Sequence, residues 1–311
     1  MLKFINNLPI ILYFRTTKYE IKELDEEKNK YNNDPLVKIY FGLGGYKWME
    51  CIDRHIHKYG YKAFDEGLGT ASKEPGFMNS MINAFKFIGN NLKQPTTYEF
   101  YLNLHKIACS HFDNTKTNTV IGPKEIGITR HICNNKLYRG FNCNNDNNII
   151  RELHNEKLIT TYIPKGLISL IKNNGLIEKQ LCKINNNKLY WNYLTKDEIK
   201  LLMNNNIKEY YNTINTTNDE ETILWAIARF HWKMELLHPT IDGNTRTNTL
   251  ILNKHLTETG YHPAILDYPM IDFLECSKIS LLSHLENGLK EWSKMAVKCG
   301  FKCTCKYCNR K

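Results

Sequence analysis

The chain has 311 residues, of which 42% are hydrophobic, enough to fold around a substantial core of its own. Lysine and arginine number 42 against 32 aspartates and glutamates, and the net charge of +10 favours acidic partners such as phosphates. The basic residues are dispersed among acidic ones, which favours a small anionic ligand over direct binding of nucleic acid.

The N-terminal stretch FINNLPIILYF, residues 4–14, is apolar, yet it is too short to cross a bilayer and contains Asn6, Asn7 and Pro9. No obvious small-residue cleavage site follows it. We expect a packed N-terminal segment, with an export signal or an interfacial membrane anchor as the alternatives.

Apolar residues recur at three- and four-residue steps along much of the chain, as they do on amphipathic helices. Thr96 and Thr97 are suitable N-caps for one helix, and Gly260 ends another. The predicted helices cover residues 75–92, 96–112, 221–237, 247–260 and 270–297. The predicted fold class is therefore all-α, a helical bundle.

Two short stretches, residues 128–141 and 181–194, predict hairpins that turn at asparagines. The asparagine tracts at residues 144–148, 173–175 and 204–206 predict loops, because asparagine side chains compete with regular structure. The expected sheet content is small.

The stretch HPTIDGNTR, residues 238–246, lies between two predicted helices. Gly243 and Asn244 precede a helix, whose first N–H groups are unpaired and whose dipole is positive at that end. Arg246 in the first turn adds a forked donor that suits phosphate oxygens, and the Asn244 amide can donate as well. This loop is expected to bind a phosphate.

Two further residues of the same stretch suggest catalysis. Asp242 would repel a neighbouring phosphate unless a divalent cation lay between them, which indicates Mg²⁺ shared with a diphosphate. His238 has a side chain whose ordinary pKa suits removing a hydroxyl proton near neutrality. Together they predict transfer of a phosphoryl-containing group to a hydroxyl.

These residues resemble the signature of Fic-domain proteins, His-x-Phe-x-Asp/Glu-Gly-Asn-Gly-Arg-x-x-Arg, and the likeness is clear over residues 223–266. The resemblance implies a Fic-type helical bundle with a small β-hairpin flap. It implies a catalytic domain over residues 76–295 with its core motif at 238–249, between an N-terminal region of unknown role, residues 1–75, and a Cys-rich basic tail, residues 296–311.

Such proteins typically move AMP from ATP to a Ser, Thr or Tyr hydroxyl of a target protein. The resemblance implies ATP as co-substrate, Mg²⁺ as cofactor and a target protein as partner, with neither nucleic acid nor membrane involved. The implied location is cytoplasmic, or the cytosol of a host cell if the protein is a secreted effector. The implied roles are general base for His238, Mg²⁺ ligand for Asp242, α-phosphate cradle for Gly243 and Asn244, and a grip on the β- and γ-phosphates for Arg246. Thr245 is a further nucleotide-binding position.

The sequence departs from the signature at three positions: Thr240 replaces the phenylalanine, Thr245 the second glycine and Thr249 the final arginine. A threonine side chain restricts the approach of backbone to phosphate, and the missing arginine removes a grip on the terminal phosphate. Family members with such changes include ones that transfer phosphocholine from CDP-choline and ones that are kinases. Transfer of phosphocholine, UMP or phosphate, or a degenerate module for protein interaction, are therefore the alternatives to AMP transfer.

Many members are held inactive by the glutamate of a Ser/Thr-x-x-x-Glu-Gly/Asn helix, which pairs with the second arginine. Glu286-Asn287 is the nearest match, but Leu282 stands four residues before the glutamate, and Thr249 offers no arginine to pair with it. We expect Glu286 to be an exposed helix residue and expect no inhibition of this type.

A hairpin upstream of the motif aligns the target in this family by strand addition. Residues 181–194 are the candidate flap, with Lys188, Leu189 and Tyr190 as docking residues. Residues 128–141 are the rival, and a hairpin that merely covers the core is the alternative to both.

One helix face supports a rival enzyme. His231, Glu235 and His238 recur at i, i+4 and i+7, and two histidines with a carboxylate can bind zinc. A zinc hydrolase is therefore the alternative to a transferase.

The ten cysteines are divided between the body of the chain and its end. Six show no spacing typical of a secreted scaffold, which favours a reducing compartment. Cys299, Cys303, Cys305 and Cys308 form C-x3-C-x-C-x2-C, a set that could hold one Zn²⁺. A disordered basic tail and lipidated thiols are the alternatives for this segment.

Overall fold

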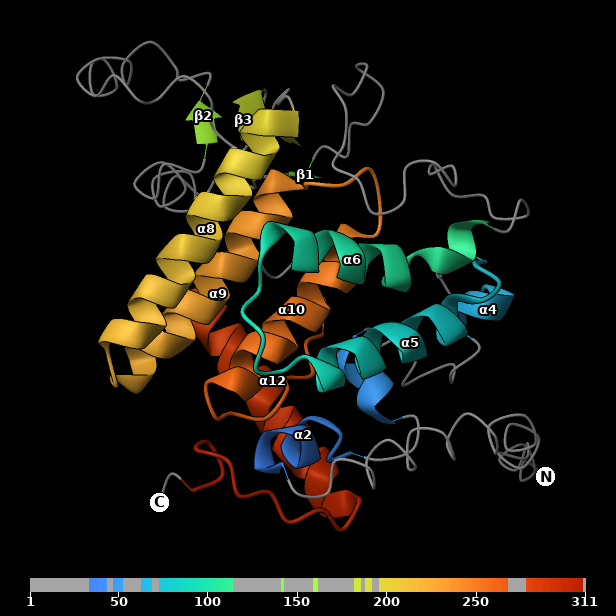
Figure 1. Ribbon diagram of the computed structural model, residues 1–311, viewed down its shortest axis with the longest axis vertical. Helices are drawn as coiled ribbons and strands as arrows, with labels where there is room; N and C mark the ends of the chain where they lie inside the picture. Colours follow the sequence, from blue (N-terminus) through green and yellow to red (C-terminus); the bar gives the residue numbers. More distant parts are fainter. Residues whose placement is uncertain are drawn as a thin grey trace, which may run out of the picture.

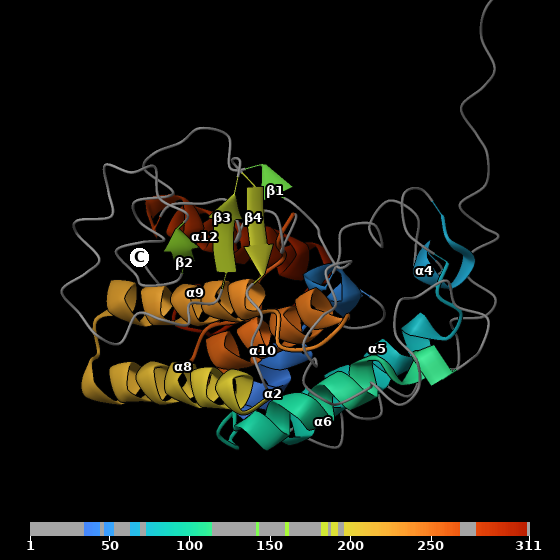
Figure 2. The same ribbon diagram turned by 90° about the horizontal axis from the view of Figure 1, so that it is seen from above.

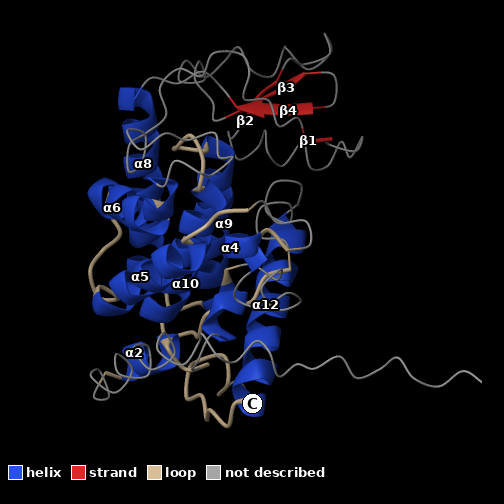
Figure 3. Ribbon diagram, turned by 90° about the vertical axis from the view of Figure 1, so that its right-hand side faces the viewer, coloured by secondary structure: helices blue, strands red, loops and turns tan. Residues whose placement is uncertain are grey.

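The protein folds into a bundle of helices with a small sheet at one end, as Figures 1 and 3 show for the computed structural model. The structure describes residues 34–43, 47–52, 63–68, 73–113, 141–142, 159–161, 182–185, 188–191, 196–267 and 278–309. The predicted, largely helical fold class is confirmed. The helices are α2 (Pro35–Tyr40), η2 (Lys47–Cys51), α4 (Ala63–Glu66), α5 (Phe77–Asn90), α6 (Tyr98–Ala108), η3 (Ser110–Asp113), α8 (Lys196–Thr216), α9 (Glu220–Leu237), α10 (Asn244–Glu258) and α12 (Lys278–Lys298).

The helices predicted from apolar spacing correspond to α5, α6, α9, α10 and α12. Thr97 caps α6 as expected, because its Oγ1 accepts a hydrogen bond from the Phe100 N–H at 3.0 Å. Gly260 follows the end of α10 with a φ of 91°, which favours glycine. Residues 270–277, predicted as the start of the last helix, lie outside the described residues.

The loop predicted at the asparagine tract of residues 204–206 is wrong, because this tract lies inside helix α8. Ile199, Met203 and Tyr210 fall at helical spacing and are buried against the rest of the bundle. Asn206 is itself buried. Tertiary packing of this face therefore overrides the weak helix propensity of asparagine.

Helix α10 is the centre of the bundle, with α9, α6, α5 and α2 packed around it (Figures 1 and 2). Most of its residues are buried, although many of them are polar. The buried Lys254 pairs with Glu258, and the Tyr210 hydroxyl donates to the same carboxylate at 2.8 Å. His255 Nε2 lies 3.0 Å from Thr96 Oγ1. Several polar groups of this helix thus bind residues of neighbouring elements, which helps to fix its position.

Residues from both ends of the chain pack into the same core as the central helices. Val37, Tyr40 and Phe41 belong to the main cluster, and the Tyr40 ring stacks on Phe85 with centroids 4.3 Å apart. Residues of the tail, including Phe301, join a smaller cluster around Trp292. Packing is therefore continuous across residues 75 and 295.

The small sheet has the strand order β1-β4-β3-β2, formed by β1 (Phe141–Asn142), β2 (Ile159–Thr161), β3 (Cys182–Asn185) and β4 (Lys188–Trp191). Strands β3 and β4 are antiparallel, with Asn185 opposite Lys188, which confirms the hairpin predicted at residues 181–194. Strand β1 pairs with the other edge of β4, where Phe141 lies opposite Leu189.

Several predicted features lie outside the described residues. These are the apolar N-terminal stretch, the asparagine tracts at residues 144–148 and 173–175, and the rival hairpin except Phe141. In the described part of the chain, no helix is both long and apolar enough to cross a membrane.

A substitution at Gly89 of α5 tests whether Phe41 packs on this helix. A Cβ at position 89 would lie 2.3 Å from Cζ of Phe41. Alanine is a better helix former than glycine, and a Gly→Ala substitution at an exposed helix position stabilises the helix by up to about 1 kcal/mol. We expect Gly89→Ala instead to lower the free energy of unfolding by about 1–3 kcal/mol through overpacking, measured by urea denaturation. Asn83→Ala, at an exposed position of the same helix, is the control, and a stabilising Gly89→Ala would contradict the packing of Phe41.

Candidate functional site

The loop between α9 and α10 begins with His238 in an unusual conformation. His238 is the C-cap of α9 and has φ 47° and ψ 62°, the only positive φ of a non-glycine residue in the described part of the chain. Its N–H donates to the Met234 carbonyl at 3.0 Å, and its side chain is half-buried. This left-handed turn is uncommon for residues other than glycine and ends the helix at the imidazole.

Gly243, at the other end of the loop, is required for two reasons. It is the N-cap of α10 with a φ of 71°, and a Cβ on it would lie 2.3 Å from Cys109 Sγ on the adjoining end of α6. His105 of α6 donates from Nε2 to the Asp242 carbonyl oxygen at 2.8 Å. Burial lowers the pKa of His105 to about 4, so this histidine is neutral near pH 7. Helix α6 therefore holds the loop directly.

Thr240 and Asn244 close the loop on itself. The Asn244 Oδ1 accepts hydrogen bonds from the Thr240 N–H at 2.9 Å and from its hydroxyl at 2.7 Å, and Asn244 Nδ2 donates to the Thr240 carbonyl at 2.9 Å. Thr240 is fully buried, and the next residue, Ile241, packs on Phe112. Hydrogen bonds thus anchor this position, where the signature has phenylalanine.

The same bonds change the predicted role of Asn244. Its side-chain amide is bonded to Thr240, so only its backbone N–H is placed to donate to a phosphate. With the N–H groups of Thr245 and Arg246, it forms the first turn of α10, whose N–H groups have no acceptor within the helix.

Asp242 lies half-buried beside this helix end. Its Oδ1 accepts from the Gly243 N–H at 2.7 Å, while Oδ2 has no hydrogen bond to the described residues. A carboxylate oxygen without a hydrogen bond, beside the start of a helix, is chemically suited to a divalent cation such as Mg²⁺.

Glu235 connects the two helices beneath the loop. It is fully buried on α9 and accepts hydrogen bonds from Asn248 Nδ2 at 2.7 Å and from the Thr245 hydroxyl at 3.2 Å. Asn248 accepts in turn from the Tyr101 hydroxyl at 2.7 Å. The threonine in place of the second signature glycine thus joins its hydroxyl to this network.

Arg246 is held by partners that the sequence did not predict. Its guanidinium forms a two-pronged pair with Glu74, at 2.9 Å and 3.2 Å, and Nη1 lies 3.2 Å from His111 Nε2. The guanidinium also lies over the rings of Phe77 and Phe112, 4.9 Å and 5.2 Å from their centroids. The side chains of Arg246 and Glu74 are only 13% and 9% exposed. The cation predicted to bind the terminal phosphates is therefore already paired.

Thr249, at the position of the second signature arginine, is buried inside α10, where its hydroxyl donates to the Thr245 carbonyl at 2.7 Å. Glu286 lies half-buried on α12. Glu74 is instead the carboxylate that reaches a motif arginine. A signal for it exists in the sequence, because residues 70–75, TASKEP, have the Ser/Thr-x-x-x-Glu spacing with Pro75 in place of Gly or Asn.

The rival zinc site on α9 is not formed in the described part of the chain. The group of metal-binding side chains found there, with ligand atoms within 4.8 Å of one another, comprises His262, Cys305 and Cys308 and includes none of His231, Glu235 and His238. His231 Nδ1 instead lies 3.2 Å from the Asn248 carbonyl oxygen.

Comparison with protein families identifies the region around the loop. The model of the Fic/DOC family matches residues 146–256, which contain α8, α9, the loop and most of α10. This part of the chain is thus similar to Fic/DOC family domains. No curated protein matches the chain.

Two solved structures are similar to this one at 14% sequence identity each. Fic-1 (residues 134–508) from C. elegans has a TM-score of 0.45, and the alignment covers 90% of this chain and 70% of that one. A Fic domain containing signaling protein from Bacteroides thetaiotaomicron has a TM-score of 0.41, with 90% of this chain and 93% of that one covered.

The pairing of Glu74 with Arg246 predicts an acid-labile contribution to stability. Burial alone would raise the pKa of Glu74, but the Arg246 charge and the hydrogen bonds from His111 and Arg246 outweigh it and hold the pKa at about 2. Because this is below the ordinary value of 4.5, the stabilisation is complete above that value and is lost as the pH falls toward about 2. We expect Glu74→Gln to lower the free energy of unfolding by about 3 kcal/mol near neutral pH.

Urea denaturation of the wild type and Glu74→Gln at several pH values measures this difference, which should shrink on acidification below the ordinary pKa. Glu286→Gln on α12 is the matched control and should have little effect. A difference that did not change with pH would show that the Glu74 carboxylate is not paired in the folded protein.

The buried carboxyl of Glu235 is expected to give the free energy of unfolding the opposite pH dependence. Burial raises its pKa from 4.5 to about 7, against the hydrogen bonds of Asn248 and Thr245, so the folded protein keeps a proton that the unfolded chain has already lost. Stability therefore decreases as the pH rises from 4.5 to about 7. Glu235→Gln cannot ionise, so its stability relative to the wild type should increase by about 3 kcal/mol across this range, measured by urea denaturation. Glu221→Gln, at an exposed position of α9, should show no such trend, and parallel curves for Glu235→Gln and the wild type would disprove the shift.

Proposed function

Since residues 146–256 are similar to Fic/DOC family domains, we propose that the protein moves AMP from ATP to a Ser, Thr or Tyr hydroxyl of a target protein. The observation that carries the proposal is the loop from His238 to Gly243, which brings an imidazole, a carboxylate and the start of α10 together between two packed helices. Hydrogen bonds from within the loop and from His105 hold it in one shape. Such preorganisation is what stabilisation of a phosphoryl transition state requires.

His238 is the general base of the proposed reaction. It accepts the proton of the target hydroxyl as the hydroxyl oxygen forms a bond to the α-phosphorus of the nucleotide. The bond from that phosphorus to the bridging oxygen breaks, and diphosphate leaves. The first-turn N–H groups of Asn244 and Thr245 donate to the α-phosphate at the positive end of α10.

Asp242 Oδ2 would hold Mg²⁺, which would neutralise charge on the diphosphate. The Gly243 N–H bond to Oδ1 orients the carboxylate for this role. The carboxylate then favours the cation, and the adjacent start of α10 favours the negatively charged phosphate.

Arg246 keeps donors for the nucleotide although Glu74 binds it. A guanidinium has five N–H donors, and the bonds to Glu74 use two of them. Its charge is, however, balanced by Glu74, and Thr249 supplies no second cation. This weak grip on terminal phosphates favours, as the second candidate, transfer of another phosphate-containing group, such as phosphocholine from CDP-choline or UMP from UTP.

The β3–β4 hairpin is the proposed docking element for the target, but the proposed docking residues differ from those predicted from the sequence. Strand β1 already pairs with β4 at Lys188 and Leu189, two of the three predicted docking residues. At Tyr190 and Trp191, β4 pairs only with β3 among the described strands. We therefore place strand addition by the target beside Tyr190 and Trp191.

The test is the intact mass of proteins from a cell lysate incubated with the purified chain, Mg²⁺ and, separately, ATP, UTP, GTP or CDP-choline. We expect a mass gain equal to AMP with ATP, and no gain with His238→Ala because the base is lost. His284→Ala on α12 is the matched control and should keep the wild-type activity.

The donor that gives a His238-dependent gain decides between AMP and the second candidate. A gain that persists in His238→Ala would refute the role of His238. No gain with any donor, on lysates of several hosts, would instead support an interaction module without catalytic activity.

A further inference from the structure

The C-terminal tail folds back from the end of α12 onto the loop that follows α10. Gly300 turns the chain with a φ of 69°, and the Phe301 N–H donates to the Ala296 carbonyl at 2.9 Å. The Lys306 N–H then donates to the Gly260 carbonyl at 2.9 Å. This return brings the cysteines of the tail against residues 260–264, far away in the sequence.

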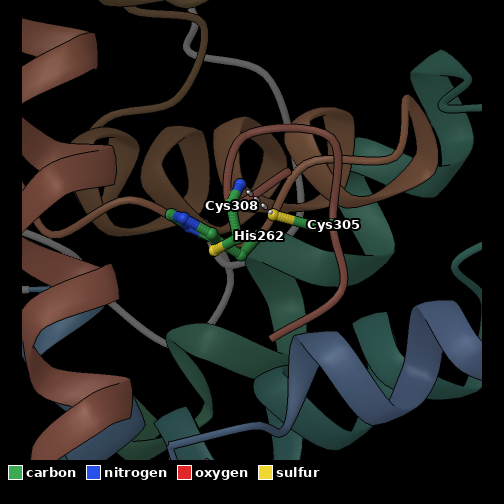
Figure 4. A group of neighbouring side chains, drawn as sticks. All are labelled: His262, Cys305 and Cys308. Carbon is green, nitrogen blue, oxygen red and sulfur yellow. Dashed lines mark hydrogen bonds between the residues drawn. The ribbon is translucent and has the colours of Figure 1, made fainter. Parts of the chain in front are cut away.

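His262, Cys305 and Cys308 meet where the tail and this loop touch (Figure 4). Their ligand atoms all lie within 4.8 Å of one another, and His262 and Cys305 are only 0% and 2% exposed. Cys303, two residues before Cys305, lies outside this group but interacts electrostatically with both cysteines, which makes its thiol the candidate for a fourth ligand. Three metal-binding side chains from two distant segments of the chain, two of them buried, thus lie together here.

The His262 ring is oriented as a metal ligand. Its Nδ1 lies 2.7 Å from the Pro263 carbonyl oxygen, which only accepts, so Nδ1 carries the proton and Nε2 the lone pair. The ring stacks on Trp292 with centroids 4.1 Å apart, and Nε2 accepts a hydrogen bond from the Ser293 hydroxyl at 2.8 Å, which a metal at Nε2 would replace. A histidine whose second nitrogen donates to a backbone carbonyl is the usual arrangement around a bound metal.

The sulfur atoms are also arranged for a metal. The Cys308 N–H points to Cys305 Sγ at 3.4 Å and can stabilise negative charge on that sulfur. Lys302 and Lys306 flank Cys303 and Cys305 in the sequence and offset the charge of thiolates. Three soft sulfur ligands with one imidazole are typical of tetrahedral zinc.

We propose that Nε2 of His262 and the thiolates of Cys303, Cys305 and Cys308 bind one structural Zn²⁺. On binding, each thiol releases its proton to solvent, and three thiolates with a neutral imidazole coordinate the ion. The proposed set differs from the four-cysteine site predicted from the sequence by having His262 in place of Cys299. Neither Cys299 nor Cys303 is in the observed group of three. Cys299 ends the last turn of α12, where its N–H donates to the Met295 carbonyl at 2.9 Å, whereas Cys303 stands beside Cys305 in the tail, so we assign the fourth position to Cys303 and not to Cys299.

The metal would fasten the tail to the end of α10. The loop with His238 and Asp242 precedes this helix, and the metal-binding loop follows it. The zinc is thus a structural clamp on the helix that carries the candidate functional site, and the proposal does not depend on the activity of that site.

Metal analysis of the full chain, purified without chelator, tests the proposal. We expect about one Zn²⁺ per chain, with three sulfurs at about 2.3 Å and one nitrogen at about 2.0–2.1 Å by X-ray absorption. Cys305→Ser and His262→Gln should lose most of the zinc. The matched control Cys299→Ser should keep it.

Zinc retained in His262→Gln and lost in Cys299→Ser would overturn the ligand set in favour of four cysteines. If the variants at the site fail to fold, the wild type decides the question. Removal of its zinc with a chelator should lower the Tm, and added Zn²⁺ should restore it. A folded, reduced chain that contains no zinc and takes up none would overturn the proposal.

Discussion

The burial of a polar helix is the constraint on which the rest of this structure depends. Helix α10 lies at the centre of the bundle, and its polar side chains are enclosed by neighbouring helices. Each buried polar group must find a partner, because an unpaired one costs about 1–3 kcal/mol. Tyr210 of α8 therefore binds Glu258, and Tyr101 of α6 and Glu235 of α9 bind Asn248. These bonds specify how the helices are placed around α10.

The same requirement shapes the candidate site at the start of α10. The Asn244 side chain is hydrogen-bonded to Thr240 and the Arg246 guanidinium is paired with Glu74, so both side chains help to hold the loop and the start of α10. In the proposed reaction, the nucleotide and the target hydroxyl are therefore met by the backbone of the first helical turn, the Asp242 carboxylate, the His238 ring and the remaining donors of Arg246. A threonine at each departure from the signature is explained by a hydrogen bond: Thr240 to Asn244, Thr245 to Glu235 and Thr249 to the Thr245 carbonyl.

Residues that are distant from α10 in the sequence contact both of its ends. Glu74 precedes α5 and reaches Arg246 in the first turn of α10, while the tail reaches the loop that follows its last turn. With zinc bound at His262, α10 would be fixed at both ends by residues distant in the sequence. The N-terminal residues and the tail are thus part of the environment of the site.

The sequence by itself determined the helices with strong apolar periodicity, the β3–β4 hairpin and the grouping of His238, Asp242 and Gly243, because each depends on residues close together in the chain. Helix α8 was missed at its asparagines, because burial of Ile199 and Met203 overrides local propensity. Tertiary structure alone decided the partners of Arg246 and brought His262 together with Cys305 and Cys308. Such contacts join residues far apart in the sequence, and they form only when the helices pack.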